Sequence, residues 1–125
     1  MPKKKLIFDT NYLVYLAKEK RMEKLEELFK LYDCFIIDIT FKEIGRLVKG
    51  KHKQRVLFLL EFLKKKIGEG KLRVIKAKTN DVDMEILKLV EKKFNVATFD
   101  KELHKAIKKL VKEKNLKIEI LKAKI

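Results

Sequence analysis

Short apolar runs alternate with longer segments of helical period along this chain, and this alternation constrains the fold more than any other feature. The runs are rich in β-branched and aromatic residues, as strands are. They cover residues 6–8, 35–37, 72–75, 96–99 and 118–120. Apolar stripes of helical period predict helices near 11–17, 22–32, 56–67, 86–94 and 103–111. Together these elements predict an α/β fold with a parallel central sheet and crossover helices.

The strand runs also indicate their places in the sheet. The first two are uninterrupted apolar stretches, which are typical of strands covered on both faces. The last run alternates with Lys117 and Glu119, which predicts a half-exposed edge strand. Because there is no linker, low-complexity tract or internal repeat, residues 1–125 are expected to form a single domain.

The chain is strongly basic, with 33 Lys and Arg against 18 Asp and Glu, a formal charge of +15. Such an excess favours a polyanionic partner, and nucleic acid above all. The alternative is solubility at high temperature, because the 41% of charged residues are mostly Lys and Glu, as in thermophile proteins. A membrane surface fits poorly, since the basic residues are spread over every segment.

The single cysteine and the N-terminal segment indicate a cytoplasmic protein. Cys34 lies in an apolar run and is expected to be a buried thiol, and one cysteine excludes an internal disulfide. Only three apolar residues separate Lys5 from Asp9, which is too short for a signal peptide, and no segment approaches membrane-spanning length.

Four acidic residues follow four successive predicted strands. In a parallel α/β sheet the sites form beyond the carboxyl ends of the strands. The loops and helix starts that follow the first four strands would therefore each bring a carboxylate to the same edge. These residues are Asp9, Glu43, Asp83 and Asp100.

Each of these acids has a structural alternative as a helix cap. Thr40 is expected to open the helix after the second strand and to form a capping box with Glu43, and Asn80 would form one with Asp83. Asp9 and Asp100 could equally be ordinary N-cap residues.

The position of Asp9 argues against capping alone. Asp9 ends an apolar run, so it should be buried near the middle of the sheet, where an unpaired carboxylate costs several kcal/mol. No Lys or Arg lies within the first strand run or just before Asp100 on its strand. One or two Mg²⁺ or Mn²⁺ ions would suit an all-carboxylate site. Metal-activated water could then hydrolyse a phosphodiester that the basic surface attracts.

At these residues the sequence resembles the PIN-domain nucleases. Their pattern begins with a strand ending in Asp-Thr-Asn or Asp-Thr-Ser, here residues 9–11, and continues with a Glu in the helix after the second strand, here Glu43. An Asp with an aliphatic residue three positions later follows, here Asp83 with Ile86. The pattern closes with Thr-x-Asp-x-x-Leu, here residues 98–103, although Phe99 stands where the family often has Asn. The match runs from about residue 6 to residue 120.

The resemblance implies a three-layer fold with five parallel strands in the order 3-2-1-4-5, and a Mg²⁺- or Mn²⁺-dependent endoribonuclease. The four acids would be the metal-binding and catalytic residues, with Asp83 preferred to Asp81 as the third. Thr10 and Asn11 would support the Asp9 loop, and Thr98 would orient Asp100. Small members of this family are often dimeric toxins silenced by an antitoxin protein, and others process ribosomal RNA within larger complexes.

Two further interpretations stay open at the level of sequence. One is a non-catalytic RNA- or protein-binding module with the same fold, whose expected signature is the loss of one or more acids, and none is lost. The other concerns the basic stretch around His52, which is either a solvated surface or a phosphate-contacting patch. If it contacts RNA, the residues expected to do so are Arg46, Lys49 and Lys53.

Overall fold

The computed structural model describes residues 2–122, and its centre is a parallel sheet of five strands in the order β3-β2-β1-β4-β5. The strands are β1 (Lys4–Phe8), β2 (Tyr32–Ile37), β3 (Leu72–Ile75), β4 (Asn95–Ala97) and β5 (Ile120–Leu121). The predicted α/β class, strand number and strand order are confirmed. Met1 and residues 123–125 of the predicted domain 1–125 lie outside the described residues.

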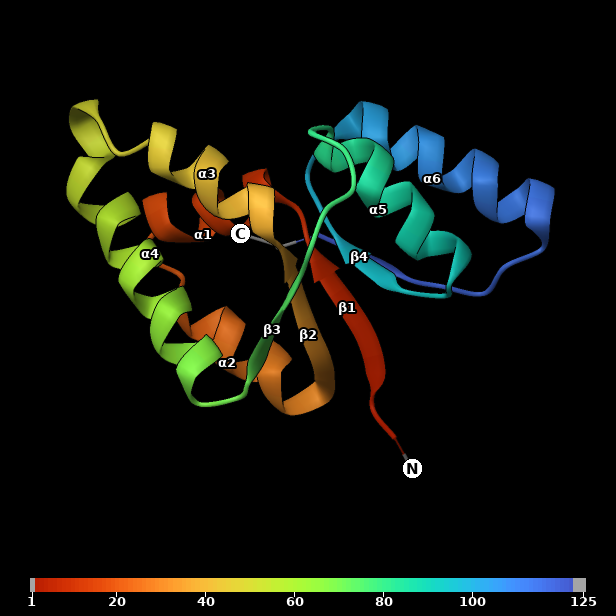
Figure 1. Cartoon of the computed structure of the whole chain (residues 1–125), viewed down its shortest axis with the longest axis horizontal. Coiled ribbons are helices and arrows are strands. Elements are labelled where there is room, and N and C mark those ends of the chain that lie inside the picture. The colour runs from red at the N-terminus through yellow and green to blue at the C-terminus, as the bar shows by residue number, and fades with distance from the viewer. Residues whose placement is uncertain (1, 123–125) are drawn as a thin grey trace.

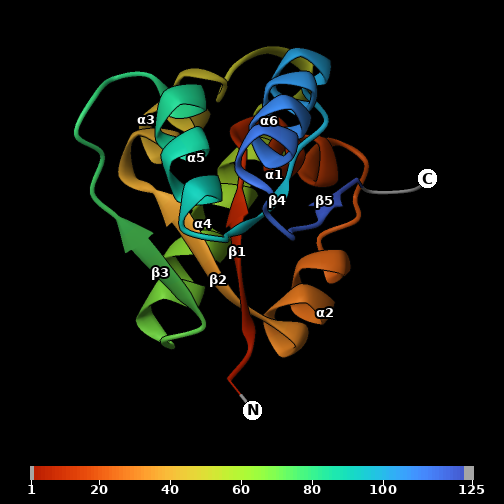
Figure 2. The same ribbon diagram turned by 90° about the vertical axis from the view of Figure 1, so that its right-hand side faces the viewer.

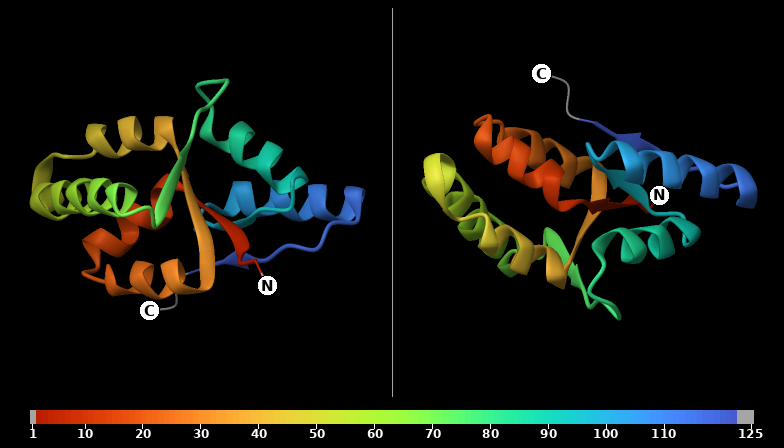
Figure 3. Two further views of the ribbon diagram at one scale, coloured as in Figure 1. Left: turned by 60° about the horizontal axis from the view of Figure 1, so that its bottom comes forward. Right: turned by 90° about the horizontal axis from the view of Figure 1, so that it is seen from above.

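Six α-helices and one short 3₁₀ helix connect the strands. The helices are α1 (Thr10–Lys18), α2 (Glu23–Leu31), α3 (Asp38–Arg46), η1 (Gly50–His52), α4 (Lys53–Gly68), α5 (Val82–Glu91) and α6 (Lys101–Lys114). Helices α1 to α4 cover one face of the sheet, and α5 and α6 cover the other (Figures 1 and 2). The three layers are also apparent from above, in the right panel of Figure 3.

The central strand β1 explains why both faces are apolar. Leu6 and Phe8 pack into the core beneath α1, α2 and α4, whereas Ile7 packs into the second core beneath α5 and α6. Successive side chains of a strand point to opposite faces, and helices cover both faces of this sheet. All three side chains are therefore fully buried. The predicted burial of Cys34, on β2, is also confirmed.

Several predicted boundaries were wrong by a few residues. Tyr32 was assigned to a helix but begins β2, and Phe94 lies beyond the end of α5, where its ring packs against Phe35 with centroids 5.1 Å apart. Both residues continue the apolar stripe of the preceding helix. The spacing of apolar residues therefore did not show that the helix ends before them. The structure also ends β4 at Ala97, two residues earlier than expected.

The start of α3 is the correction that concerns the site. The helix begins at Asp38, directly after β2, and not at Thr40. Thr40 is fully buried inside α3, and its hydroxyl has no hydrogen-bond partner among the described residues. The predicted capping box between Thr40 and Glu43 is therefore wrong. Glu43 instead lies in the second turn of α3.

Within residues 2–122, no helix combines the length and the apolar character that crossing a lipid bilayer requires.

Candidate functional site

Asp9 lies where the central strand ends and α1 begins. Its side chain is 5% exposed, which confirms the predicted burial. Asp9 is the N-cap of α1, and its Oδ1 accepts a hydrogen bond from the backbone N–H of Thr10 at 2.9 Å. The capping interpretation is thus correct for one oxygen of Asp9, while the other oxygen has a different partner.

That partner is Thr98, which connects the first and the fourth acids. The buried Thr98 hydroxyl donates to Oδ2 of Asp9 at 2.6 Å and accepts the backbone N–H of Asp100 at 3.1 Å. The resemblance implied that Thr98 orients Asp100. In the structure Thr98 contacts only the backbone N–H of Asp100, and its hydroxyl donates a hydrogen bond to Asp9.

Asp100 combines a cap with a place beside Asp9. As the N-cap of α6, it accepts the backbone N–H groups of Glu102 and Leu103 at 2.9 and 3.1 Å. Both bonds go to Oδ1, so among the described residues Oδ2 has no protein donor. A carboxylate has about four lone-pair positions, and capping one oxygen leaves the other for a ligand.

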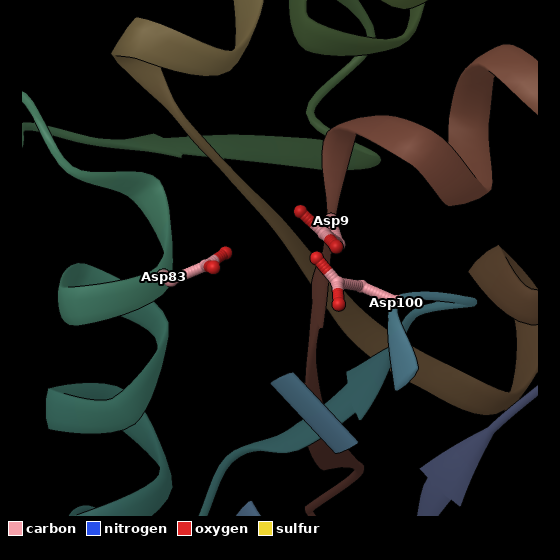
Figure 4. A group of neighbouring side chains, drawn as sticks. All are labelled: Asp9, Asp83 and Asp100. Atoms are coloured by element: carbon pink, nitrogen blue, oxygen red, sulfur yellow. The ribbon is translucent and has the colours of Figure 1, made fainter. Parts of the chain in front are cut away.

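The third acid reaches the group from the opposite helix. Asp83 lies in the first turn of α5, and Figure 4 shows its carboxylate pointing toward Asp9 and Asp100. The predicted capping box of Asn80 with Asp83 is wrong, because Asp81 is the N-cap and accepts from the Met84 N–H at 3.2 Å. Capping therefore occupies Asp81, while Asp83 faces the other two acids.

The three carboxylates form one compact group. One carboxylate oxygen from each of Asp9, Asp83 and Asp100 lies within 4.8 Å of the other two. None of these residues takes part in an ion pair with a Lys or Arg of residues 2–122. No Lys or Arg among residues 2–122 therefore compensates the negative charge of this group.

The lack of compensation is reflected in the pKa values. Burial raises the pKa of Asp9 to about 6, and repulsion from Asp83 and Asp100 adds to this, whereas the bonds from Thr98 and Thr10 lower it. The pKa of Asp83 is also raised, first by partial desolvation and then by repulsion from Asp100, Asp81 and Glu43. A carboxyl group whose ionised form is disfavoured by its surroundings is one that a bound cation would stabilise.

Glu43 lies near this group but outside it. The Thr10 hydroxyl donates a hydrogen bond to Oε1 of Glu43, and the charge of Glu43 reaches Asp83, whose pKa it raises. Asn11, the other expected support, accepts the backbone N–H of Phe99 at 3.3 Å. Thr10 and Asn11 thus connect the Asp9 loop to α3 and to the loop after β4.

Two acids that the sequence analysis did not single out hold the loop before α5. Asp38 accepts the backbone N–H of Ala77 at 3.0 Å, and the buried Glu85 accepts from the backbone N–H of Lys78 and the hydroxyl of Thr79, at 3.1 and 2.9 Å. This loop leads directly into the turn that carries Asp83. Asp38 directly follows a strand, which was the available signal, but its partner lies 39 residues further along the chain.

The three predicted substrate-binding residues are all exposed. Arg46 ends α3, Lys49 precedes η1 and Lys53 begins α4. None of them is in an ion pair with another described residue. They are thus free to contact an anion, but they do not join the carboxylate group.

The carboxylate group fits a small hard cation. Its donors are all oxygen, which Mg²⁺ and Mn²⁺ prefer, and no thiolate or imidazole is among them. Adjacent oxygens on one Mg²⁺ would lie about 3 Å apart, so oxygens that lie within 4.8 Å of each other would move closer together to bind one ion. Three protein ligands would leave coordination positions for water and phosphate.

The Thr98 hydroxyl gives a first testable prediction. Thr98→Val keeps the shape of the side chain but removes the bond to Asp9, so we expect the pKa of Asp9 to rise above its value of about 6. The unfolding free energy should fall by about 2 kcal/mol at neutral pH, because a hydrogen bond to a charged group is lost. Carboxyl NMR titration and denaturant unfolding without metal measure both effects.

Thr40→Val is the matched control for Thr98→Val. It removes a buried hydroxyl that has no partner among the described residues, so the pKa of Asp9 should stay unchanged. An unchanged Asp9 pKa in Thr98→Val would contradict the role assigned to Thr98.

Comparisons with known proteins support the fold but give no information on the function. No protein-family model matches the chain, and no curated protein matches it. Among solved structures, it is similar to a domain of a functionally unknown protein from Methanocaldococcus jannaschii DSM 2661. The two are 21% identical, with a TM-score of 0.55, over 98% of this chain and 94% of that one. At this identity the likeness shows a shared fold alone.

Proposed function

We propose that this chain is a Mg²⁺- or Mn²⁺-dependent endoribonuclease of the PIN-domain kind. One observation carries the proposal: the buried Asp9 lies beside Asp83 and Asp100, and no Lys or Arg in the described part of the chain pairs with any of them. Gathering three carboxylates without a cation is unfavourable, so a bound metal ion gives the arrangement a physical reason. The charge of +15 gives the same protein an attraction for a polyanion.

Asp9, Asp83 and Asp100 would hold the ion. When bound, a divalent ion would make a water molecule more acidic and would stabilise the negative charge that develops on the phosphate. Glu43, oriented by Thr10, adds a fourth negative charge near Asp83 and so increases the attraction of the site for a cation.

The chain itself contributes fixed ligand positions. Both oxygens of Asp9 accept a hydrogen bond, and one oxygen of Asp100 is fixed by the first turn of α6. Carboxylates held in this way lose little conformational freedom when they bind a ligand, and their orientation is already set. Asp38 and Glu85 hold the loop that positions Asp83, so they act on the site without belonging to it.

Arg46, Lys49 and Lys53 are proposed to contact phosphates of the substrate. The preference for RNA over DNA follows from the resemblance to PIN-domain nucleases. An antitoxin protein and a second copy of the chain stay predicted partners. A role in ribosomal RNA processing stays the alternative prediction.

The decisive experiment measures the cleavage of labelled RNA. We expect cleavage with Mn²⁺, none with EDTA and none by Asp9→Asn in the presence of Mn²⁺, with a DNA of the same sequence as the substrate control. Equal cleavage by wild type and Asp9→Asn would reveal a contaminating nuclease and contradict the proposal. Binding of the RNA without cleavage by either protein would favour the non-catalytic binding module.

A further inference from the structure

A second charged feature lies at the opposite end of the sheet, where the strands begin. Here the start of β1, the turn between α5 and β4 and the segment before β5 surround a hollow of about 520 Å³. These three segments run beneath α5 and α6 in Figure 1, away from the edge that carries the acids. Four lysines line this hollow, which we call the lysine hollow: Lys4, Lys5, Lys93 and Lys117.

None of these four ammonium groups is in an ion pair with another described residue. Elsewhere on the chain, lysines such as Lys66, Lys88 and Lys114 do have a Glu within ion-pair distance. Four positive charges around one concavity outnumber the single carboxylate there, that of Glu119, and a concave surface with an excess of one sign concentrates counter-ions. The lysine hollow is therefore a place where an anion would be stabilised.

The walls of the lysine hollow are held in place by a buried amide. Asn95 is 4% exposed, and its side chain donates to the backbone carbonyl of Lys5 at 3.0 Å and accepts the backbone N–H of Glu119 at 2.7 Å. Asn is disfavoured in strands, and here it links β1 to the residue just before β5. The two walls that carry Lys5 and Lys117 are thus fixed relative to each other before any ligand binds.

Two of these lysines have unusual local surroundings. Lys93 has a φ of 69°, in the left-handed region that favours glycine, yet it carries a long charged side chain. The ammonium of Lys5 lies 5.2 Å from the centroid of the Phe94 ring, a cation–π contact that holds it near the hollow.

Phosphate is the anion chemistry that fits. Lysine ammonium groups bind phosphates as point charges without demanding a planar partner. Lys5 lies in β1 and Asp9 directly follows that strand, four residues later and about 13 Å away, so a phosphate in the hollow is not the one that reaches the carboxylate group. A ligand that occupies both places must carry several phosphates along a chain.

We propose that the lysine hollow binds backbone phosphates of the RNA substrate at a distance from the carboxylate group. The choice of RNA as the polyanion rests on the proposed function, whereas the anion site itself does not.

The test measures the binding of a labelled single-stranded RNA in EDTA, so that cleavage plays no part. In the hollow variant, all four lysines of the lysine hollow are replaced by Gln. We expect its affinity at low salt to fall at least about tenfold, and the slope of log K against log salt to decrease by about 2 to 3, because about 0.7 is lost per phosphate contact on a single strand. Circular dichroism and thermal unfolding check that the variant is folded.

A control variant with the same charge separates clustering from net charge. It replaces four exposed lysines scattered over α2, α4 and α6 by Gln, and it should retain most of the affinity and the slope. These lysines are Lys30, Lys65, Lys109 and Lys112. Equal weakening of binding in both variants would overturn the proposal, because net charge alone would then explain it.

Single substitutions keep the proposal testable if the hollow variant does not fold. Lys93→Gly removes a charge and suits the left-handed backbone, so it should weaken RNA binding without loss of stability. Glu119 is the carboxylate in the hollow, and Glu119→Gln should tighten binding, whereas Glu113→Gln on the exposed surface of α6 should change it little. The absence of both expected effects would overturn the proposal.

Inorganic tripolyphosphate distinguishes RNA from a free phosphate compound. We expect RNA to bind more tightly than tripolyphosphate, and the hollow variant to bind both more weakly. If only tripolyphosphate binding depended on the four lysines, the assignment to RNA would be wrong. A lack of cleavage with Mn²⁺ would contradict the proposed nuclease function and leave these binding results unaffected.

Discussion

Asp83→Asn is expected to lower the rate of RNA cleavage with Mn²⁺ at least about 100-fold, because loss of a residue that merely supports a metal ligand already costs about 10- to 100-fold. Its carboxylate reaches within 4.8 Å of Asp9 and Asp100 from the opposite helix, and the amide that replaces it carries no negative charge. The measurement is single-turnover cleavage of labelled RNA over a range of Mn²⁺ concentrations. The variant should also need more Mn²⁺ for half-maximal activity.

The neighbouring Asp81 provides the matched control. Asp81→Asn makes the same chemical change two residues away, but Asp81 caps α5, and Asn is about as good an N-cap as Asp. We therefore expect Asp81→Asn to keep cleavage within about threefold of the wild type, a change that corresponds to about 0.7 kcal/mol. The opposite result, with Asp81→Asn inactive and Asp83→Asn active, would exchange the two assignments.

The predictability of this fold follows from how its strands are covered. Because β1 is buried on both faces, the residues Leu6, Ile7 and Phe8 read as one apolar run, and the alternation of such runs with helices indicated the parallel sheet. The order of the strands came from the resemblance, since the alternation itself is compatible with other orders. Helix boundaries were less predictable, as at Asp38 and Tyr32, because the end of an apolar stripe does not mark the end of a helix.

The candidate site was predictable where a residue's place follows from the strand before it. Asp9 and Asp100 come directly after β1 and shortly after β4, so the parallel topology brings them together at one edge. Glu43 and Asp83 depend in addition on the phase of a helix. The misplaced start of α3 explains why Glu43 was expected to cap a helix. Contacts across long stretches of sequence, such as Asp38 with Ala77, leave no local pattern to recognise.

Asp9→Asn is expected to make the metal-free protein more stable at high pH, although it removes a proposed metal ligand. The pKa of Asp9 is about 6 in the folded protein, against an ordinary value of 3.8 for an Asp side chain in water. Between these values the folded state keeps a proton that the unfolded state has lost, so the contribution of Asp9 to the unfolding free energy falls as the pH rises from about 4 to above 6. Asn carries no charge and avoids this loss.

The magnitude follows from the size of the pKa difference. A shift of about 2 units corresponds to about 3 kcal/mol, so the stability of Asp9→Asn relative to wild type should increase by about 2 to 3 kcal/mol between pH 4 and pH 8. Comparing the two pH values cancels the constant cost of the altered bonds to Thr98 and Thr10. Urea unfolding in EDTA at both pH values measures this change.

Mn²⁺ should reverse the order of stabilities at pH 8. An ion at 100 times its dissociation constant stabilises the folded wild type by about 2.7 kcal/mol, and Asp9→Asn should lose most of this gain. The reversal separates a metal ligand from a carboxylate that is merely buried, because burial alone predicts the pH effect without any response to Mn²⁺. If the stability of Asp9→Asn relative to the wild type fell instead of rising from pH 4 to pH 8 in EDTA, Asp9 would be compensated by a positive group of the protein, and the case for a metal site would fail.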